Sequence, residues 1–262
     1  NGPMKTLGSL TSMAPQAVIF QHSKPLTSIS RTAISNESNM KLRPDNPALA
    51  EGRSVFFYKT KPVSEIKRVL QPAANNSKIG KGFTNIAKGK WRGVPIYTLT
   101  LEERATCPRD CSKWANCYGN NMRFATRISH IESDALCARI ESELQDLLRM
   151  YRQVCIRLHV LGDFFSVEYV QFWHSMMAKH KDLLLFGFTH WKRETEIGMQ
   201  LQGINVAFPE RSWIRFSDQG GPMSANVEGV GIPCPEQTGK TKSCLTCGIC
   251  WSTSEPVSFK EH

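Results

Sequence analysis

The chain has 262 residues, of which 40% are hydrophobic and 21% are charged, and these proportions exclude a wholly disordered protein. No run of residues is long and apolar enough for a membrane span, since the longest apolar run, residues 183–188, has the length of a strand. The N-terminus lacks the charged stretch and apolar core of a secretory signal, so we expect a cytoplasmic protein with no membrane partner.

The net charge of +10 is confined to the first third of the chain. Residues 1–93 contain 15 Lys or Arg against 4 Asp or Glu, whereas residues 94–262 contain 18 against 19. A positive excess in one region is typical of proteins that bind a polyanion. We therefore expect a nucleic acid partner, with its contact surface ahead of residue 94.

The first 93 residues divide into an arm and a basic segment. Residues 1–53 are rich in Ser, Thr, Asn and Pro without a sustained hydrophobic period, which predicts a flexible or loosely docked arm. Residues 54–93 form the basic segment, with a short strand expected at residues 54–59 and a short helix at residues 63–70.

The most basic stretch, residues 75–95, has five basic and two aromatic residues, four Gly and no acid. Gly allows close backbone approach, cations release counterions from phosphates, and Phe83 or Trp91 could stack on a base. A solvated loop that merely happens to be basic is the alternative. The expected nucleic acid contacts are Lys78, Lys81, Lys88, Lys90 and Arg92.

From residue 94 onward, strands alternate with helices. Strands are expected at residues 94–101, 154–161, 182–191 and 212–218. Helices are expected at residues 129–153, 167–180 and 194–201. This alternation predicts an α/β fold with a parallel sheet or a partial parallel (β/α) barrel over residues 94–228.

The strand pattern also assigns faces. In residues 154–161 the even positions are aliphatic, whereas Cys155, Arg157 and His159 share the other face of the strand. We expect this other face to line a lumen. In residues 212–218, Arg215 and Ser217 share a face in the same way. Ligands of α/β folds bind at the carboxyl ends of strands. Asp163, His190 and Asp218 fall there. The alternative for Arg157, His159 and Arg215 is a set of buried groups that hydrogen-bond to one another.

The chain has nine cysteines, an odd number that, in a reducing compartment, favours metal binding over disulfides. Cys107, Cys111 and Cys117 follow the first strand of the alternating region with the spacing C-x3-C-x5-C. Three thiolates on one loop can hold three irons of a 4Fe-4S cluster and leave the fourth iron open. A zinc site completed by a fourth ligand from elsewhere is the alternative.

A second set of cysteines lies in residues 229–262, which we expect to form a metal-binding segment. Cys234, Cys244, Cys247 and Cys250 supply four thiolates, and three of them have the C-x2-C-x2-C spacing of bacterial ferredoxins. There are three alternatives for these four thiolates: they bind a closed 4Fe-4S cluster, they bind a zinc ion, or one of them completes the first site.

The order of a strand, a three-cysteine loop, a long helix and a strand ending in Gly162-Asp163 resembles the radical S-adenosylmethionine superfamily over residues 94–220. The resemblance implies a partial (β/α) barrel that holds a 4Fe-4S cluster and S-adenosylmethionine. It also implies that S-adenosylmethionine is cleaved to a 5′-deoxyadenosyl radical with an electron from a separate donor. Taken together with the strand faces, the resemblance gives two groups of candidate site residues. Catalytic residues would be Asp163, His159 and Arg157. Cofactor contacts would be Gly162, Asp163, Arg215, Ser217 and Asp218, with the methionyl amino group at Gly162-Asp163 and the ribose near Ser217-Asp218.

The segments CPRDC…CYG, RLHVLGDFFS and CPEQTGKTKSC…C…CW also resemble a group of phage-encoded, cysteine-rich proteins. That likeness implies the cytoplasm of a bacterial host as the setting, but no activity. The leading hypothesis is therefore an iron-sulfur enzyme of radical S-adenosylmethionine type that acts on nucleic acid or nucleotides. The alternative is a non-catalytic DNA- or RNA-binding protein with structural zinc or iron-sulfur centres.

Overall fold

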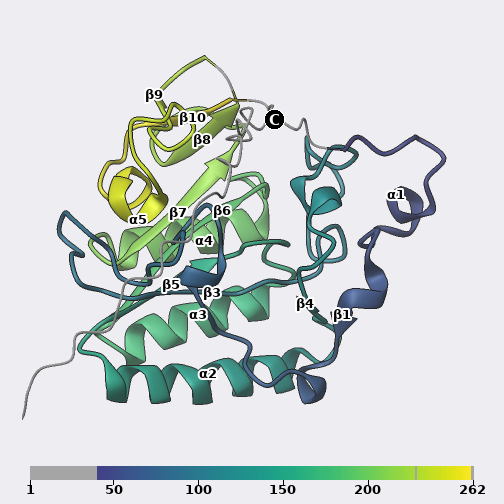
Figure 1. Ribbon diagram of the computed structural model, residues 1–262. Coiled ribbons are helices and arrows are strands. Elements are labelled where there is room, and N and C mark those ends of the chain that lie inside the picture. The colour runs from purple at the N-terminus through teal and green to yellow at the C-terminus, as the bar shows by residue number, and fades with distance from the viewer. Residues whose placement is uncertain (1–39, 228, 261–262) are drawn as a thin grey trace, which may run out of the picture. The chain divides into compact units, whose positions relative to one another are not determined.

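The computed structural model describes residues 40–227 and 229–260, which are built around one mostly parallel sheet (Figure 1). In spatial order its eight strands are β2 (Gln71–Pro72), β3 (Ile96–Thr98), β5 (Val154–Leu158), β6 (Leu183–Thr189), β7 (Ser212–Ser217), β8 (Ser224–Val227), β10 (Val257–Phe259) and β9 (Ile232–Pro233). Only the β2–β3 pair is antiparallel. The α/β class is confirmed, and in the described part the sheet does not close into a barrel.

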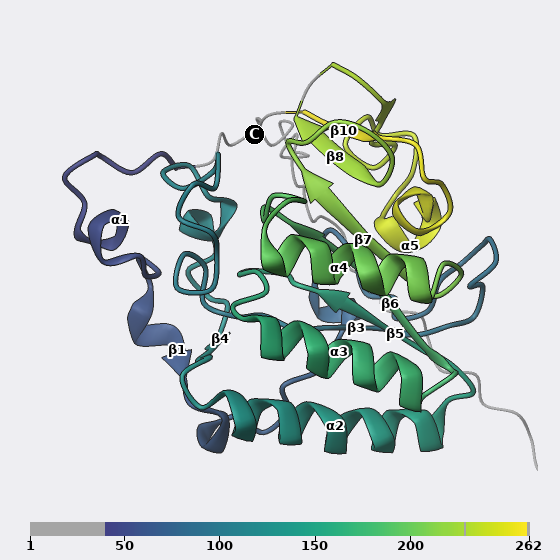
Figure 2. The same ribbon diagram turned by 180° about the vertical axis from the view of Figure 1, so that it is seen from behind.

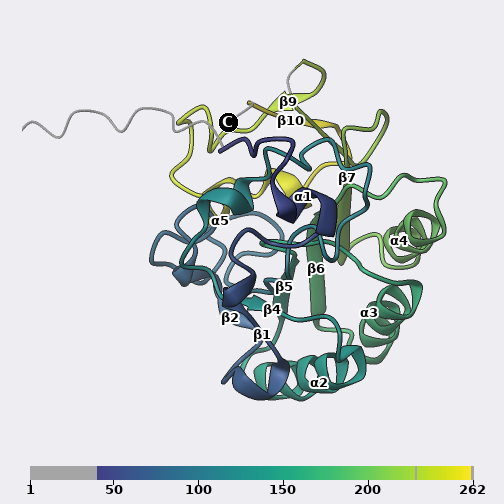
Figure 3. The ribbon, with the colours of Figure 1, turned by 90° about the vertical axis from the view of Figure 1, so that its right-hand side faces the viewer.

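The central strands are neighbours in the order in which they occur in the chain, and each crossover contains a helix. The helices are α2 (Ser133–Met150), α3 (Val167–Lys179) and α4 (Glu196–Ala207). All three cover the same face of the sheet (Figures 2 and 3). Helix α2 turns a buried stripe toward it, formed by Leu136, Ile140, Leu144 and Leu147. The side chains of Ser166 and Thr195 cap the first turns of α3 and α4.

The opposite face of the sheet is covered by two segments that are distant in the sequence. These segments are the loop of residues 75–95 and helix α5 (Cys244–Cys247). They are joined by a hydrogen bond from the Cys244 N–H to the carbonyl of Lys78 (3.3 Å). Trp91 stacks on Trp251 at 6.0 Å, and Trp251 packs on Phe186 of β6. This face is therefore a second core, and Trp91, 3% exposed, cannot stack on a base as predicted.

Two short elements expected near the start of the chain differ from the structure. Residues 54–59 contain a 3₁₀ turn (Phe57–Lys59), and only β1 (Thr60–Lys61) is extended, paired with β4 (Arg127–Ile128). Residues 63–70 form one 3₁₀ turn, Val63–Glu65. The N–H groups of Val69 and Leu70 donate to the carboxylate of Glu143 on α2, so they do not bond within a helix. The remaining 3₁₀ turns are Ala73–Asn75, Tyr118–Asn121 and Ile249–Trp251.

The end of the expected arm is docked. Helix α1 (Pro47–Glu51) lies against the first cysteine loop, where the carbonyl of Leu49 accepts from the indole of Trp114 (3.1 Å) and that of Ala50 accepts from Arg109 (3.1 Å). Residues 40–53 are thus part of the folded unit, while residues 1–39 lie outside the described residues.

Among residues 40–227 and 229–260, no helix has the length and apolar character needed to cross a membrane.

Candidate functional site

The candidate site lies at the carboxyl edge of the sheet. Because β3, β5, β6 and β7 are parallel, the segments that follow them emerge at one edge. The cysteine loop follows β3, Asp163 follows β5, His190 follows β6 and Asp218 follows β7. The topology therefore brings together the strand-end residues that the sequence predicted.

Asp163 is buried at this edge and fixed by its neighbours. Its carboxylate accepts from the backbone N–H groups of His190 and Phe164, both at 2.8 Å, and its own N–H donates to Thr106 Oγ1 at 3.1 Å. Burial raises the pKa of Asp163 to about 7, although the hydrogen bonds from His190 and Phe164 oppose the shift. Since Thr106 immediately precedes Cys107, the carboxylate is held beside the start of the cysteine loop.

The three cysteine thiols of this loop are half-buried and belong to one electrostatic cluster with Asp163. Burial, and then the charges of Asp163 and Cys117, raise the pKa of Cys107 well above its usual range. Burial raises the pKa of Cys111 to about 12, and the charges of Cys117 and Asp163 act in the same direction. Burial also raises the pKa of Cys117. Without a bound cation these groups therefore stay protonated thiols.

The chemistry of this donor set fits an iron-sulfur cluster, because three thiols share one loop and each can bind a different iron. The described residues contain no group of three or more His, Cys, Asp or Glu side chains that is arranged around a single metal ion.

The cysteine loop is braced by a buried ion pair that the sequence analysis did not predict. Arg127 and Glu103 are almost fully buried and pair at 2.7 Å, and Arg127 also donates to the carbonyls of Gly119 and Ala125. Arg104 donates to the carbonyl of Trp114 at 2.9 Å. These bonds fix the backbone on both sides of Cys117. No spacing in the sequence marks Glu103 as the partner of Arg127.

Gly162 allows the end of β5 to approach the cysteine loop. It has φ +79°, and a Cβ atom there would lie 2.5 Å from Thr106 Oγ1 and 2.7 Å from Leu101 Cβ. Only glycine fits such a contact without displacing backbone. The sequence predicted Gly162 as a cofactor contact, and the structure places it between Asp163 and the residue before Cys107.

Asp218 forms the far side of the site. Its carboxylate accepts from Ser112 of the cysteine loop and lies 3.7 Å from His190 Nε2. Burial lowers the pKa of His190, and the nearby charge of Asp218 acts against that shift. Ser217, the residue before Asp218, is half-buried at the end of β7. Asp110 of the same loop pairs with Lys192 at 2.6 Å, so polar contacts tie the loop to the segments after β6 and β7.

Arg157 lies between the two groups of cysteines. Its guanidinium is over the rings of Phe186 (5.5 Å) and Phe188 (5.3 Å), and its buried Nε has no hydrogen-bond partner among the described residues. Burial raises the pKa of Cys244 to about 11, and the charge of Arg157 opposes the shift. Burial likewise raises the pKa of Tyr118, which follows Cys117, and Arg157 again opposes it. One cation therefore acts on residues from both cysteine groups.

His159 does not share the face of Arg157 as predicted. Its ring packs on Phe164 (5.0 Å) and Tyr169 (5.9 Å), and its Nε2 lies 3.1 Å from the Tyr169 hydroxyl. Strand β5 ends at Leu158, so the alternation of faces stops before His159. Burial lowers the pKa of His159 to about 3, with the charge of Arg157 contributing. His159 is a neutral residue of the aromatic core on the helix side.

Arg215 is fully buried and donates to four backbone carbonyls. The acceptors are the carbonyls of Ser224, Cys250, Thr253 and Glu255. These bonds use four of its five N–H groups, so its side chain is engaged in holding the C-terminal segment on β7. This arrangement supports an anchoring role in place of the predicted contact with a cofactor.

Three thiols of the second cysteine group interact electrostatically. Burial raises the pKa of Cys250 to about 12, and the charges of Cys244 and Cys234 act in the same direction. Cys247 is the last residue of α5. Among the described residues these side chains do not form a group that could hold a metal ion.

The five cationic side chains predicted to contact nucleic acid, Lys78, Lys81, Lys88, Lys90 and Arg92, are all exposed. Two of the lysines pair with acids: Lys81 with Glu236 at 3.4 Å, and Lys90 with Glu210. Phe83 is 73% exposed and is available for stacking.

A family model described as Gene product 88 matches residues 66–220, which include the first cysteine loop and the ends of β3, β5, β6 and β7. The match agrees with the resemblance to phage-encoded proteins, and no radical S-adenosylmethionine family matches. Neither a curated protein nor a solved structure matches the chain.

Proposed function

This chain belongs to the Gene product 88 family, and we propose that it is an iron-sulfur enzyme of radical S-adenosylmethionine type that acts on nucleic acid or nucleotides. The observation that carries the proposal is the meeting of Cys107, Cys111 and Asp163 at the carboxyl edge of the parallel sheet. Parallel α/β folds bind ligands at this edge. The sequential strand order and the helices on one face are also those of a partial (β/α) barrel.

Cys107, Cys111 and Cys117 would hold the cluster. When bound through three thiolates, a 4Fe-4S cluster supplies an electron and keeps one iron open for a further ligand. In the free protein, burial opposes ionisation of these thiols, and so does the charge of Asp163 on Cys107 and Cys111. A cationic centre offsets that cost, and the loop that carries the thiols is held by the Glu103–Arg127 pair whether or not a centre is bound.

Asp163 would receive the amino group of S-adenosylmethionine. Its carboxylate is desolvated and accepts from two backbone N–H groups, and an ammonium group that reached it would gain a charge-assisted hydrogen bond. Gly162 lets the end of β5 lie close to the cysteine loop, because a Cβ atom there would meet Thr106 and Leu101. Asp218, about 30% exposed, would accept hydrogen bonds from ribose hydroxyls on the other side of the site.

Arg157 would bind an anionic or carbonyl group of the substrate. Its unpartnered Nε is a buried donor, and buried donors in native proteins are normally paired. The guanidinium lies over the rings of Phe186 and Phe188, and these contacts help to position it. A phosphate or a base carbonyl of a nucleic acid fits this donor.

The second candidate is a non-catalytic DNA- or RNA-binding protein with structural metal centres. The packing of Cys244 and Cys250 against the core that contains Leu245 and Trp251 favours it. A metal at that position would join the C-terminal segment to the sheet without access to substrate.

Formation of 5′-deoxyadenosine by anaerobically purified protein tests the proposal. With dithionite and S-adenosylmethionine, we expect product from the wild type and from Cys137→Ala, whose thiol lies on α2, but none from Cys111→Ala. Absence of product from the wild type, or equal product from Cys111→Ala, would contradict the proposal.

A further inference from the structure

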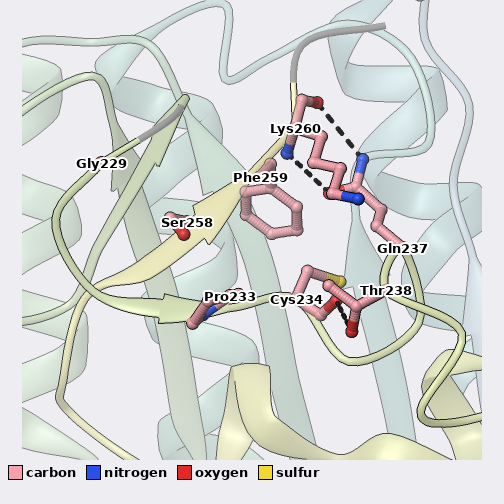
Figure 4. A pocket seen from close by; sticks show the side chains of 8 residues that line it. All are labelled: Gly229, Pro233, Cys234, Gln237, Thr238, Ser258, Phe259 and Lys260. Carbon is pink, nitrogen blue, oxygen red and sulfur yellow. Dashed lines mark hydrogen bonds between the residues drawn. The ribbon is translucent and has the colours of Figure 1, made fainter.

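A pocket of about 190 Å³ opens beyond the carboxyl ends of β9 and β10, at the same edge of the sheet as the cysteine loop (Figure 4). Its walls come from residues 229–238 and from the end of β10. The lining residues are Gly229, Pro233, Cys234, Gln237, Thr238, Ser258, Phe259 and Lys260.

One wall of the pocket is fixed by a side-chain clasp. The amide of Gln237 accepts from the backbone N–H of Lys260 (3.0 Å) and donates to its carbonyl (3.4 Å), and Figure 4 shows both bonds beside the ring of Phe259. The pocket thus offers an aromatic ring, the hydroxyl group of Ser258 and an exposed lysine, while the Thr238 hydroxyl donates to the carbonyl of Cys234 (3.2 Å). This combination suits a small planar ligand with polar edges.

The basic segment adjoins this pocket. Lys78 Nζ lies 5.8 Å from the centre of the Phe259 ring, and Lys81 pairs with Glu236, the residue before Gln237, at 3.4 Å. Lys78 therefore lies beside the pocket, and Lys81 is joined to the segment that lines it by an ion pair that offsets part of its charge. A polyanion that follows these cations would pass the mouth of the pocket.

The pocket is also connected to Arg157. The ring of Phe188 meets that of Phe259 edge-on at 5.7 Å, and the guanidinium of Arg157 lies 5.3 Å from the Phe188 ring. A group bound against Phe259 would be separated from Arg157 by the side chains of Phe259 and Phe188. The rings of Phe259 and Phe188 thus link the pocket to Arg157 through direct side-chain packing.

We propose that this pocket receives one unpaired base of a single-stranded nucleic acid whose phosphates lie along Lys78 and Lys81. The inference rests on the proposed function and names its substrate class. The volume is below the roughly 300 Å³ at which pockets for drug-sized ligands begin, so it suits one base and not a longer segment. Sequence-tolerant binding of single strands combines this kind of stacking with a cationic track for the backbone. A base within a duplex is stacked and paired, and it must leave the helix before it can enter a pocket.

The test is fluorescence anisotropy with a labelled twelve-residue oligothymidylate and the full-length protein. Phe259→Ala should weaken binding about tenfold or more, because one stacked base is lost. Phe259→Tyr keeps the ring and should bind within about twofold of the wild type. Phe208→Ala is the matched control and should bind like the wild type, since Phe208 is also half-buried with a cation, Arg211, over its ring but lies on the helix side.

Three results would overturn the inference: no binding by the wild type at low salt, equal affinity of Phe259→Ala and wild type, or equal affinity of the wild type for the matching duplex. Failure of the proposed function is distinguished by the Cys107→Ala protein. Suppose that Cys107→Ala binds the oligonucleotide, that adding Phe259→Ala to it weakens binding, and that the wild type makes no 5′-deoxyadenosine. The pocket would then be assigned correctly, and the proposed enzymatic activity would be wrong.

Discussion

The carboxylate of Asp163 accepts a hydrogen bond from the backbone N–H of His190 at 2.8 Å, which ties the end of β5 to the end of β6. The backbone of Asp163 donates in turn to Thr106, next to Cys107. One residue therefore fixes the relative positions of two strand ends and of the cysteine loop. The same carboxylate is desolvated, and its charge acts on the thiol of Cys107.

Replacing Asp163 with Asn should weaken S-adenosylmethionine binding about tenfold or more, because a charge-assisted hydrogen bond contributes about 1.5 to 3 kcal/mol. The amide keeps the shape of the side chain and an oxygen that can accept from His190 or Phe164. Calorimetric titration of the iron-loaded protein measures the effect, with iron content as the control for an intact cluster. Unchanged affinity in Asp163→Asn, or no binding by the wild type at millimolar ligand, would show that this carboxylate has another role.

Arg215→Met should release the C-terminal segment. The substitution keeps an apolar stem but leaves four buried carbonyls without their donor, at a cost of at least about 3 kcal/mol. Tryptic cleavage after the exposed Lys240 and Lys242 should become much faster. Arg149→Met, at an exposed position of α2, should be cleaved like the wild type. If Arg215→Met is equally resistant, the carbonyl contacts do not hold the segment.

His159 should make the fold sensitive to acid. Its folded-state pKa, about 3, is below the ordinary value of 6.5, so the unfolded chain binds the proton more readily and stability falls as the pH drops below 6.5. Between pH 7 and pH 5 the free energy of unfolding of the wild type should fall by about 2 kcal/mol more than that of His159→Gln. Urea unfolding of both proteins at the two pH values measures this difference. An equal fall in the free energy of unfolding of the two proteins would mean that His159 is protonated in the folded protein.

Neutralising Lys88, Lys90 and Arg92 together should reduce the salt dependence of nucleic acid binding. Each phosphate contact contributes about 0.7 to 0.9 to the slope of log affinity against log salt, so the slope should fall by about 2 to 3. We expect the lower end of that range, because Lys90 already pairs with Glu210. The control is a triple variant of Arg149, Lys179 and Lys181 near the ends of α2 and α3. Equal slopes for both triple variants would mean that the exposed cations of residues 75–95 do not contact nucleic acid.

Strong local periodicity made the central α/β unit predictable from the sequence. Helix α3 was expected at residues 167–180 and runs over Val167–Lys179, and β6 was expected at residues 182–191 and runs over Leu183–Thr189. Since parallel strands end at one edge, the positions of Asp163 and Asp218 at the site also followed from the sequence.

Contacts between distant residues explain what was not predicted. The N–H groups of Val69 and Leu70 bond to Glu143, more than 70 residues away, so the local helical pattern at residues 63–70 is not realised. Trp91 is buried by Trp251, and Glu103 finds Arg127 across the loop. No local pattern contains such partners, because each depends on the tertiary arrangement.

The metal content of anaerobically purified protein tests the central claim most directly. Iron, acid-labile sulfide and zinc are measured per chain in the wild type, in Cys107→Ala, Cys111→Ala and Cys117→Ala, and in the control Cys137→Ala. We predict iron and sulfide in equal amounts in the wild type, the loss of about four irons in each of the three loop variants, and no loss in Cys137→Ala. Full iron content in all four variants, or a wild type with zinc and no sulfide, would contradict the assignment of these thiols to an iron-sulfur cluster.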